Sequence, residues 1–385
     1  MHRQSSTVSS FFVNTLLPPQ HSHPRANSRR IPRLAAVFSY VLIAALLLAF
    51  LSFPASGTAK KIILDTDPGT DDAMALMLAL NSPELDLRAV TVVPGNVTAR
   101  QGLENALRMV SLANRCDIPV AGGAQHPLFQ KLVTAEFWHG KNGLANIELP
   151  ASKCKVDPRY GPDLIIELIH ANPHEITLVP VGPLTNIALA LEKDPSIVPL
   201  VKEVILMGGS IKGGNVNAAA EANIYNDPEA AQIVFQAGWP LTMVGLDVGD
   251  KTLFSRKYLA DLGRTHGPVN DFVYAVAKFL VELSEKFGDT GSPMYDPLAV
   301  GVAIDSALVT APAMHVDVET RGDFTRGETV ANRRNEVERN VLHHSPDGDR
   351  YVIEAIDKVE PNAKVCVAVQ SEKFLQMFVA RLQGK

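Results

Sequence analysis

The stretch Lys61-Ile-Ile-Leu-Asp65-Thr-Asp67-Pro-Gly-Thr-Asp71-Asp72-Ala-Met74 places four carboxylates within eight residues. They stand where an apolar run that predicts a strand gives way to an apolar segment that predicts a helix. Four like charges this close repel one another, and helix capping explains only one or two of them. Clustered carboxylate oxygens suit a hard cation such as Ca²⁺ or Mg²⁺. The stretch therefore indicates a cation or substrate site at a strand end.

After residue 60, short apolar runs alternate with helix-like segments. Most of these runs are continuous, as expected for strands buried on both faces. We therefore predict an α/β fold with an open, mostly parallel, Rossmann-like sheet and helices on both faces. The predicted strands are Lys61–Thr66, Leu87–Val93, Ile176–Val181, Glu203–Met207, Leu241–Leu246, Met314–Thr320 and Lys364–Val369. The predicted helices are Asp71–Asn81, Ala99–Asn114, Pro162–Asn172, Pro183–Asp194, Pro228–Ala237, Pro268–Phe287 and Pro297–Asp305, and Arg321–Arg350 is expected to form an excursion or hairpin.

Small and polar residues follow several of the predicted strands. Open α/β sheets bind ligands beyond the carboxyl ends of their strands. Pro94-Gly95-Asn96 follows one strand, and Gly182-Pro183-Leu-Thr-Asn186 follows another. The later loop Asn215-Val-Asn217 to Glu221-Ala-Asn223 offers donors and acceptors for sugar hydroxyls, although an Asn-rich loop alone is usually turn chemistry. Met294-Tyr295-Asp296-Pro297 adds one more carboxylate, which in isolation reads as a helix N-cap.

Composition narrows the classes of protein. The chain has 385 residues and a formal net charge of −5, and it lacks the basic patch that a nucleic-acid partner requires. Its three cysteines, Cys116, Cys154 and Cys366, are too few for a disulfide framework and allow at most one bridge. No cysteine or histidine spacing suggests zinc. We expect ordinary buried cysteines.

The first 59 residues differ from the rest. Basic residues between Arg25 and Arg33 precede Leu34–Ala59, a stretch without any charge that ends in small residues. This is the order of a secretory signal. The apolar part, Leu34 to Phe53, is also long enough for an uncleaved membrane anchor. We therefore expect a signal peptide or anchor over residues 1–59, a functional domain over 60–385, and a secreted or periplasmic location.

Taken together and in order, six motifs resemble the inosine–uridine preferring nucleoside hydrolase family over about residues 60–370. They are Asp65-Thr-Asp67-Pro-Gly-Thr-Asp71-Asp72-Ala, Pro94-Gly-Asn96, Pro180-Val-Gly-Pro-Leu-Thr-Asn186, Met207-Gly-Gly, Glu221-Ala-Asn223-Ile-Tyr-Asn-Asp-Pro-Glu-Ala and Tyr295-Asp296-Pro297. The resemblance implies a fold of the nucleoside hydrolase type. It also implies Ca²⁺-dependent hydrolysis of the N-glycosidic bond of ribonucleosides to ribose and free base, by a homo-oligomer, either a dimer or a tetramer.

The resemblance also assigns roles to matching residues. It implies that Ca²⁺ is held by Asp67, Asp72, the main-chain carbonyl of Val181 and Asp296. Asp67 is expected to act as the general base, with Asp65 as support. The implied ribose ligands are Asp71, Asn96, Asn215, Glu221 and Asn223, and His139 is expected near the nucleobase.

Three positions depart from the family pattern. Val181 stands where Thr is frequent, but only its carbonyl is required. Ala222 replaces an aromatic residue, and Tyr295 replaces a His that protonates the leaving base in some members. We expect Tyr295 to bind the substrate and favour stacking or pocket shaping over proton donation, because the ordinary pKa of tyrosine, near ~10, suits acid catalysis poorly. Purine or pyrimidine preference stays open.

Two other functions deserve a test. A non-catalytic extracytoplasmic protein that captures nucleosides would keep the same sugar site. An Asp-dependent phosphatase also uses paired aspartates after a strand, but Asp67 is followed by Pro-Gly instead of the phosphatase pattern. A turnover assay separates both from a hydrolase.

Overall fold

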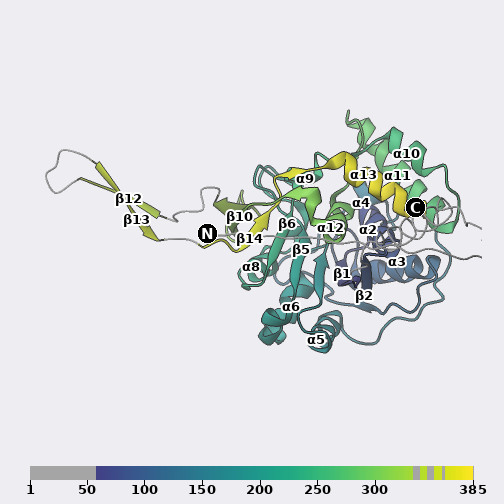
Figure 1. The fold of residues 1–385 in the computed structure, drawn as a ribbon, viewed down its shortest axis with the longest axis horizontal. Helices are drawn as coiled ribbons and strands as arrows, with labels where there is room; N and C mark the ends of the chain where they lie inside the picture. Colours follow the sequence, from purple (N-terminus) through teal and green to yellow (C-terminus); the bar gives the residue numbers. More distant parts are fainter. Residues whose placement is uncertain (1–57, 333–338, 345–350, 358–359, 385) are drawn as a thin grey trace, which may run out of the picture. The chain divides into compact units, whose positions relative to one another are not determined.

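A computed structural model describes residues 58–332, 339–344, 351–357 and 360–384 (Figure 1). The expected signal or anchor over residues 1–59 lies outside this part of the chain, apart from its last two residues. Within the described ranges, no helix is long and apolar enough to cross a membrane.

Nine strands form one open sheet in the order β11-β10-β14-β6-β5-β4-β1-β2-β3. The strands from β3 to β14 run parallel, and β10 pairs antiparallel with both β14 and β11 near one edge. Their bounds are β1 Lys60–Thr66, β2 Leu85–Val92, β3 Val120–Gly122, β4 Thr177–Pro180, β5 Glu203–Met207, β6 Leu241–Val244, β10 Ala313–Val318, β11 Thr329–Asn332 and β14 Ala363–Val365. The predicted open, mostly parallel sheet is confirmed.

Short antiparallel pairs form outside the main sheet. They are β7 Leu253–Phe254 with β8 Ser292–Pro293, β9 Val309–Thr310 with β15 Ala368–Val369, and β12 Arg339–His344 with β13 Tyr351–Asp357. β11 and β12 fall in the region Arg321–Arg350, where the sequence predicts an excursion or hairpin. The predicted strand Lys364–Val369 is two strands, because β14 pairs in the main sheet whereas β15 pairs with β9.

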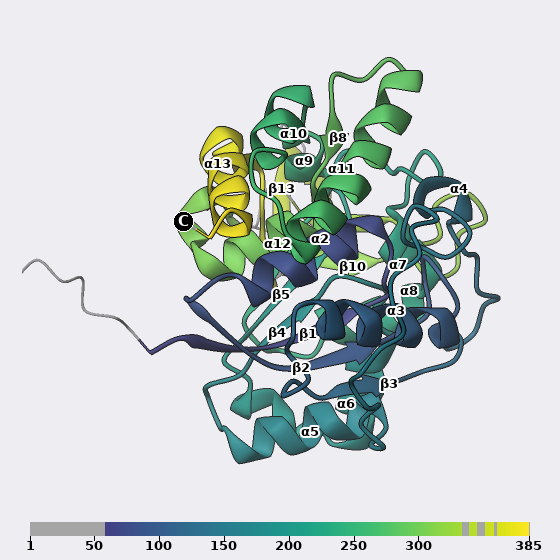
Figure 2. The ribbon, with the colours of Figure 1, turned by 90° about the vertical axis from the view of Figure 1, so that its right-hand side faces the viewer.

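Helices cover both faces of the sheet. One face carries α2 Thr70–Leu80, α3 Ala99–Leu112, α10 Arg256–Leu262, α11 Pro268–Lys286, α12 Tyr295–Ile304 and α13 Ser371–Leu382. The other carries α5 Gly161–Ala171, α6 Thr185–Lys193 and α8 Pro228–Phe235. Figure 2 shows α5 and α6 on the opposite side of the sheet from α2 and α12. In β1, Ile62 and Leu64 pack toward the first face and Ile63 toward the second, which explains the continuous apolar run.

Shorter helices lie in the connections. They are α4 Glu136–His139, α7 Ala222–Asn226, α9 Leu246–Gly249, η1 Pro195–Leu200 and η2 Ser306–Leu308. The prolines at the starts of α8 and α11 begin these helices as predicted. α12 instead begins at Tyr295, ahead of the predicted start at Pro297, which brings Asp296 into its first turn.

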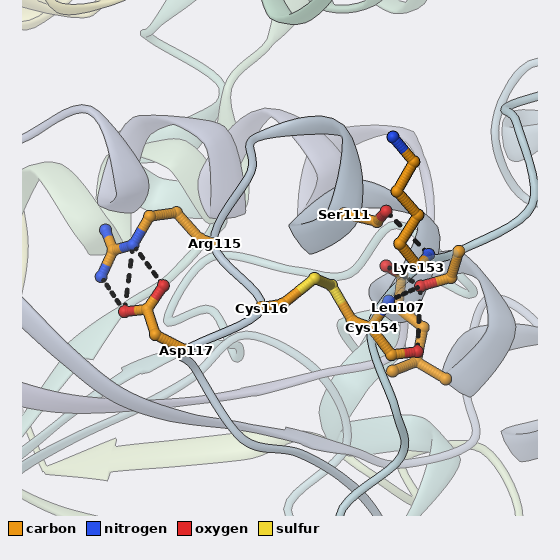
Figure 3. The surroundings of a disulfide bond; sticks show 8 residues. Leu107, Ser111, Arg115, Cys116, Asp117, Lys153 and Cys154 are labelled. Carbon is orange, nitrogen blue, oxygen red and sulfur yellow. Dashed lines mark hydrogen bonds and ion pairs between the residues drawn. A yellow bond between two sulfur atoms is a disulfide. The ribbon is translucent and has the colours of Figure 1, made fainter.

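The expectation of ordinary buried cysteines is wrong for two of the three. Cys116 and Cys154 form a disulfide across a sequence separation of 38, whereas Cys366 is free and buried. Figure 3 shows why the two meet: the segment that ends at Cys154 runs beside the end of α3. The main-chain N–H of Lys153 donates to Oγ of Ser111 at 3.0 Å.

Candidate active site

The site lies where the chain reverses its direction across the sheet. From β1 the chain moves outward to β2 and β3, and then returns to place β4 on the other side of β1. Ligands bind at such a switch point in open α/β sheets. The carboxyl ends of β1 and β4 are adjacent there, and the N–H of Val181 donates to the carbonyl of Asp65 at 2.8 Å.

The Asp67 carboxylate is enclosed by two glycines from different loops. A Cβ added at Gly95 would stand 2.0 Å from Oδ2 of Asp67, and one added at Gly182 would stand 2.5 Å from Oδ1. Any side chain at either position would collide with the carboxylate. This close approach accounts for the glycines after β2 and β4.

Asn96 and Asp72 hold the loop that follows β1, from Asp67 to Gly69, in place. The main-chain N–H of Asn96 donates to Oδ2 of Asp67 at 2.6 Å, and its side-chain amide donates to Oδ2 of Asp72 at 2.9 Å. Asp72 also accepts the main-chain N–H groups of Asp67 at 3.1 Å and Gly69 at 2.9 Å. Oδ1 of Asp67 has no hydrogen-bond partner in the described residues.

Asp65 connects neighbouring elements at the strand ends next to the site through hydrogen bonds. Its Oδ1 accepts hydrogen bonds from Oγ1 of Thr91 at 2.6 Å and from the amide of Asn186 at 2.8 Å. Asn186 in turn accepts the N–H of Ala124 at 2.8 Å. Asp65 thus joins β1 to β2 and α6. Burial raises the pKa of Asp65 to about 7.

Three carboxylates come together in a group that could hold a metal ion. Ligand oxygens of Asp71, Asp72 and Asp296 lie within 4.8 Å of one another. Asp71 was assigned to the ribose by resemblance, and Asp67, assigned to the metal, is not one of the three. Within the described part of the chain, Lys and Arg form no ion pair with these groups. Oδ1 of Asp67 and of Asp71 are buried without hydrogen-bond partners.

The electrostatics of this group favour a bound cation. Burial raises the pKa of Asp71 to about 6. Burial, followed by the charges of neighbouring carboxylates, raises the pKa values of Asp67 and Asp296 well above the usual range. Uncompensated buried charge costs several kcal/mol, so a cation would stabilise the ionised forms. The donors are all hard oxygens, and they fit Ca²⁺ or Mg²⁺.

Glu221 and Asn223 connect the later polar loop to the switch point. Glu221 caps α7, and its carboxylate accepts N–H groups from Gly209 at 3.0 Å and Asn223 at 2.9 Å. The Asn223 amide donates to the carbonyl of Val181 at 2.8 Å. A carbonyl oxygen has a second lone pair, so Val181 retains one for a metal. Asn215 lies in the exposed part of the loop, where its Oδ1 accepts the N–H of Ala222 at 3.0 Å.

His139 lies beside the carboxylates but carries no charge. The main-chain N–H of Thr70 donates to Nδ1 of His139 at 3.1 Å, which requires Nδ1 to be unprotonated. Burial lowers the pKa of His139 to about 4. The 3.6 Å approach of Nδ1 to Oδ1 of Asp71 is therefore not an ion pair at neutral pH, and the ring can donate only from Nε2.

Tyr295 packs against α9 and makes a polar contact there. A Cβ at Gly249 would stand 2.3 Å from the Tyr295 ring, so the ring lies directly on the helix backbone. The phenolic Oη donates to Oδ1 of Asp250 at 2.8 Å. Burial raises the pKa of Tyr295, and the hydroxyl therefore stays protonated at neutral pH.

Comparisons with known proteins agree with this geometry. Residues 62–376 match the family model described as inosine-uridine preferring nucleoside hydrolase. The chain belongs to this family. It is an enzyme that cleaves nucleosides to base and ribose, and the resemblance drawn from the six motifs is confirmed. This assignment replaces the phosphatase and the non-catalytic binding protein.

Several nucleoside hydrolases are similar over nearly their whole length. The pyrimidine-specific ribonucleoside hydrolase RihA of Salmonella arizonae is 39% identical over 336 residues, covering 84% of this chain and 99% of the relative. The plant nucleoside hydrolase PpNRh1 has a TM-score of 0.76 at 37% identity, with 84% of this chain and 99% of the other covered. The purine-preferring ribonucleoside hydrolase of Gardnerella vaginalis has a TM-score of 0.76 at 34% identity, with 84% and 98% covered.

Several supporting residues were not predicted. Thr70 and Asn186 lie inside motifs that the sequence analysis quotes, so closer attention to their polar side chains could have found them. Asn105 of α3 donates to the carbonyls of Pro68 at 3.1 Å and Asn142 at 2.8 Å. It thereby ties the carboxylate loop to the loop that carries His139, and no motif marks it.

Proposed function

We propose that the chain is a Ca²⁺-dependent ribonucleoside hydrolase with Asp67 as its general base. The observation that carries this proposal is the set of buried carboxylates at the switch point, which have no cationic partner among the described residues. Such a set is costly unless a cation and a substrate complete it.

Asp67, Asp72, the carbonyl of Val181 and Asp296 would hold the ion. When bound, Ca²⁺ would orient the attacking water and lower its pKa. The two oxygens of Asp67 differ in a way that suits a base. Oδ2 is held by the N–H of Asn96 at 2.6 Å, whereas Oδ1 has no hydrogen-bond partner in the part of the chain that the structure describes. Oδ1 is therefore the atom that takes the proton.

The sugar is bound by groups with spare hydrogen-bonding capacity. Oδ1 of Asp71 accepts no hydrogen bond from any described residue, and it can accept one from a ribose hydroxyl. The oxygens of the Asn96 and Asn223 amides are available as further acceptors, because among the described residues only the nitrogens of these amides are engaged. Cleavage of an N-glycosidic bond builds positive charge on the ribose ring. The neighbouring carboxylates stabilise that charge, most strongly in the transition state.

The identity of the preferred base requires measurement. Relatives of similar identity are named pyrimidine-specific and purine-preferring. We propose that His139 contacts the base as a donor from Nε2, because Nδ1 is engaged with Thr70. Such a donor suits a carbonyl oxygen or a ring nitrogen of the base.

A nucleoside panel tests the activity and its metal together. Purified protein is assayed for base release from uridine, cytidine, adenosine, inosine and guanosine, after chelation and after addition of Ca²⁺ or Mg²⁺. We expect chelation to abolish turnover and Ca²⁺ to restore it. Asp296→Asn should lose Ca²⁺ affinity, whereas Asp323→Asn, at an exposed carboxylate, should not. Full turnover in metal-free protein contradicts the proposal.

We also propose that the enzyme works outside the cytoplasm, as a dimer or tetramer. The charge-free stretch Leu34–Ala59 supports export, and the Cys116–Cys154 disulfide is typical of proteins in oxidising compartments. Mass spectrometry of native protein should find a mature N-terminus near Lys60 and an oxidised bond, and light scattering should find an oligomer. A reduced, unprocessed cytoplasmic chain contradicts export, and a retained Leu34–Phe53 segment identifies an anchor. An enzyme that is active as a monomer contradicts the proposed dimer or tetramer.

A further inference from the structure

The hydroxyl of Tyr295 has a defined hydrogen-bond direction. Oη donates to Oδ1 of Asp250 at 2.8 Å, and an ionised carboxylate only accepts. A phenol has a single hydroxyl proton, and the hydrogen bond to Asp250 uses it. The remaining capacity of Oη is that of an acceptor. Asp250 makes no other side-chain hydrogen bond within the described residues.

The ring cannot easily turn away from this arrangement. It lies on the backbone of Gly249, where an added Cβ would stand 2.3 Å from Cδ1 of Tyr295. Gly249 and Asp250 are neighbours at the end of α9, so one short segment supports the ring and binds the hydroxyl. The half-buried Tyr295 is thus held at two points.

Tyr295 is also close to the groups that would bind the nucleoside. It directly precedes Asp296, which belongs to the carboxylate group of the site. Burial is the main cause that raises the pKa of Tyr295, followed by the charge of Asp250 and the hydrogen bond to it, and the charges of Asp71 and Glu221 add to the shift. Asp71 and Glu221 come from two different segments around the site, so the phenol lies within the electrostatic reach of both.

We propose that Asp250 sets Tyr295 as a hydrogen-bond acceptor toward the nucleoside, so that the pair selects substrates presenting an N–H or O–H donor there. The donor is an amino group of the base or the primary hydroxyl of the ribose. The inference rests on the proposed function and deepens it by naming a specificity pair. The same geometry argues against Tyr295 as the acid that protonates the leaving base, because its proton is directed at Asp250.

Matched substrates and variants test the pair. Cytidine and uridine differ by an amino group in place of a carbonyl, as do adenosine and inosine, and a third pair compares uridine with its analogue lacking the primary hydroxyl. Tyr295→Phe removes the oxygen and keeps the ring. Asp250→Ala releases the phenolic proton, and Asp250→Asn keeps an acceptor oxygen. Asp289→Ala is the control, because this exposed carboxylate influences Asp250 only through its charge.

The readout is the ratio of kcat/KM within each pair, relative to the wild-type ratio. In the pairs that differ in the group that Tyr295 binds, Tyr295→Phe should shift this ratio against the donor-bearing substrate by roughly tenfold. In the base pairs, Asp250→Ala should shift it in the same direction, because the freed hydroxyl can then donate to the carbonyl that stands in place of the amino group. Asp250→Asn and Asp289→Ala should stay within about twofold of wild type, the change expected when no hydrogen bond is lost.

The outcomes separate the two donors and the two proposals. A shift in the base pairs identifies the amino group, and a shift in the third pair alone identifies the sugar hydroxyl. Ratios within about twofold of wild type for Tyr295→Phe in all three pairs overturn the inference, whether or not Asp250→Ala folds. If wild-type protein with Ca²⁺ releases no base, the proposed function has failed. Calorimetry with carbon-linked isosteres of adenosine and inosine then gives the same ratio from dissociation constants.

Discussion

The side-chain amide of Asn223 donates a hydrogen bond to the main-chain carbonyl of Val181 at 2.8 Å. The two residues carry different expected roles, since Asn223 is assigned to the sugar and the Val181 carbonyl to the metal. The same amide nitrogen lies 3.3 Å from the carbonyl of Met207, so it joins the ends of β4 and β5. The proposed sugar and metal sites therefore share one hydrogen bond.

Asn223→Ala should weaken the binding of both the nucleoside and Ca²⁺. Loss of the amide removes one sugar contact and frees the Val181 carbonyl from the partner that orients it. We expect KM to rise and Ca²⁺ affinity to fall by roughly 10–100-fold, the usual effect of removing a group that orients a metal ligand. Calorimetric titration with Ca²⁺ and steady-state kinetics measure the two effects. Val181→Thr is the control, because it keeps the carbonyl and should leave both quantities unchanged. An unaltered Ca²⁺ affinity in Asn223→Ala would show that the hydrogen bond to Val181 does not couple the sugar site to the metal site.

Asp67→Asn should lower kcat by at least ~10²–10⁴, the range for a lost general base. The carboxamide oxygen can still accept the N–H of Asn96, so the loop geometry should persist. Because Asp67 is also an expected metal ligand, the variant must be assayed at Ca²⁺ concentrations that calorimetry shows to be saturating. A folded, metal-loaded Asp67→Asn protein with a near wild-type rate rules out the assigned role.

The metal-free enzyme should lose stability as the pH rises. In the folded state the pKa values are raised to about 7 for Asp65 and about 6 for Asp71, whereas unfolded aspartate titrates near ~3.9. Between these values the folded state binds more protons, so the free energy of unfolding falls with increasing pH. Chelated protein should melt roughly 5 °C lower at about pH 8 than at about pH 5.5.

Saturating Ca²⁺ provides the control for this pH dependence. A bound cation replaces the protons as the partner of the carboxylates, so it should raise the melting temperature at about pH 8 and remove most of the slope. Neighbouring arginines lower the pKa values of Asp117 and Asp157. These two acids therefore affect stability at a lower pH and in the opposite direction. A metal-free melting temperature that is flat or rises over this range contradicts the assignment.

The sequence predicted those parts of the fold that depend on local pattern. β1 was expected over Lys61–Thr66 and spans Lys60–Thr66, because its apolar run faces helices on both sides. Strand β3, Val120–Gly122, was missed, since three residues carry no detectable periodicity. Helix α13, Ser371–Leu382, was also missed, although its buried Phe374 and Phe378 are spaced as in a helix.

The site was predictable where motifs carry it and not where distant segments meet. Asp72 and Asn96 were named from their motifs, and the structure joins them at 2.9 Å. Asp250 was not named, because its contact with Tyr295 spans 45 positions and no local pattern marks it. The Cys116–Cys154 bond was missed for the same reason, since only the packing of the later segment beside α3 brings the two together.

That disulfide leads to the last prediction. The bond closes the segment that carries His139 just beyond the end of α3, and hydrogen bonds also join this segment to α3. The carbonyl of Leu107 accepts from Oγ of Ser152 at 2.9 Å, and Oγ of Ser111 accepts from Lys153 (Figure 3). Opening a loop of this length should cost roughly 3–4 kcal/mol in the chain-entropy account.

The double variant Cys116→Ala/Cys154→Ala should therefore melt roughly 5 °C below wild type. It should also be cut faster by proteases between residues 117 and 153. Arg115→Ala is the matched control, since it breaks only the exposed pair with Asp117 beside the bond, and such pairs contribute about 1 kcal/mol or less. Because His139 is positioned mainly by Thr70, kcat should change little. Equal melting temperatures and cleavage rates for the double variant and wild type show that the α3 hydrogen bonds alone hold this segment.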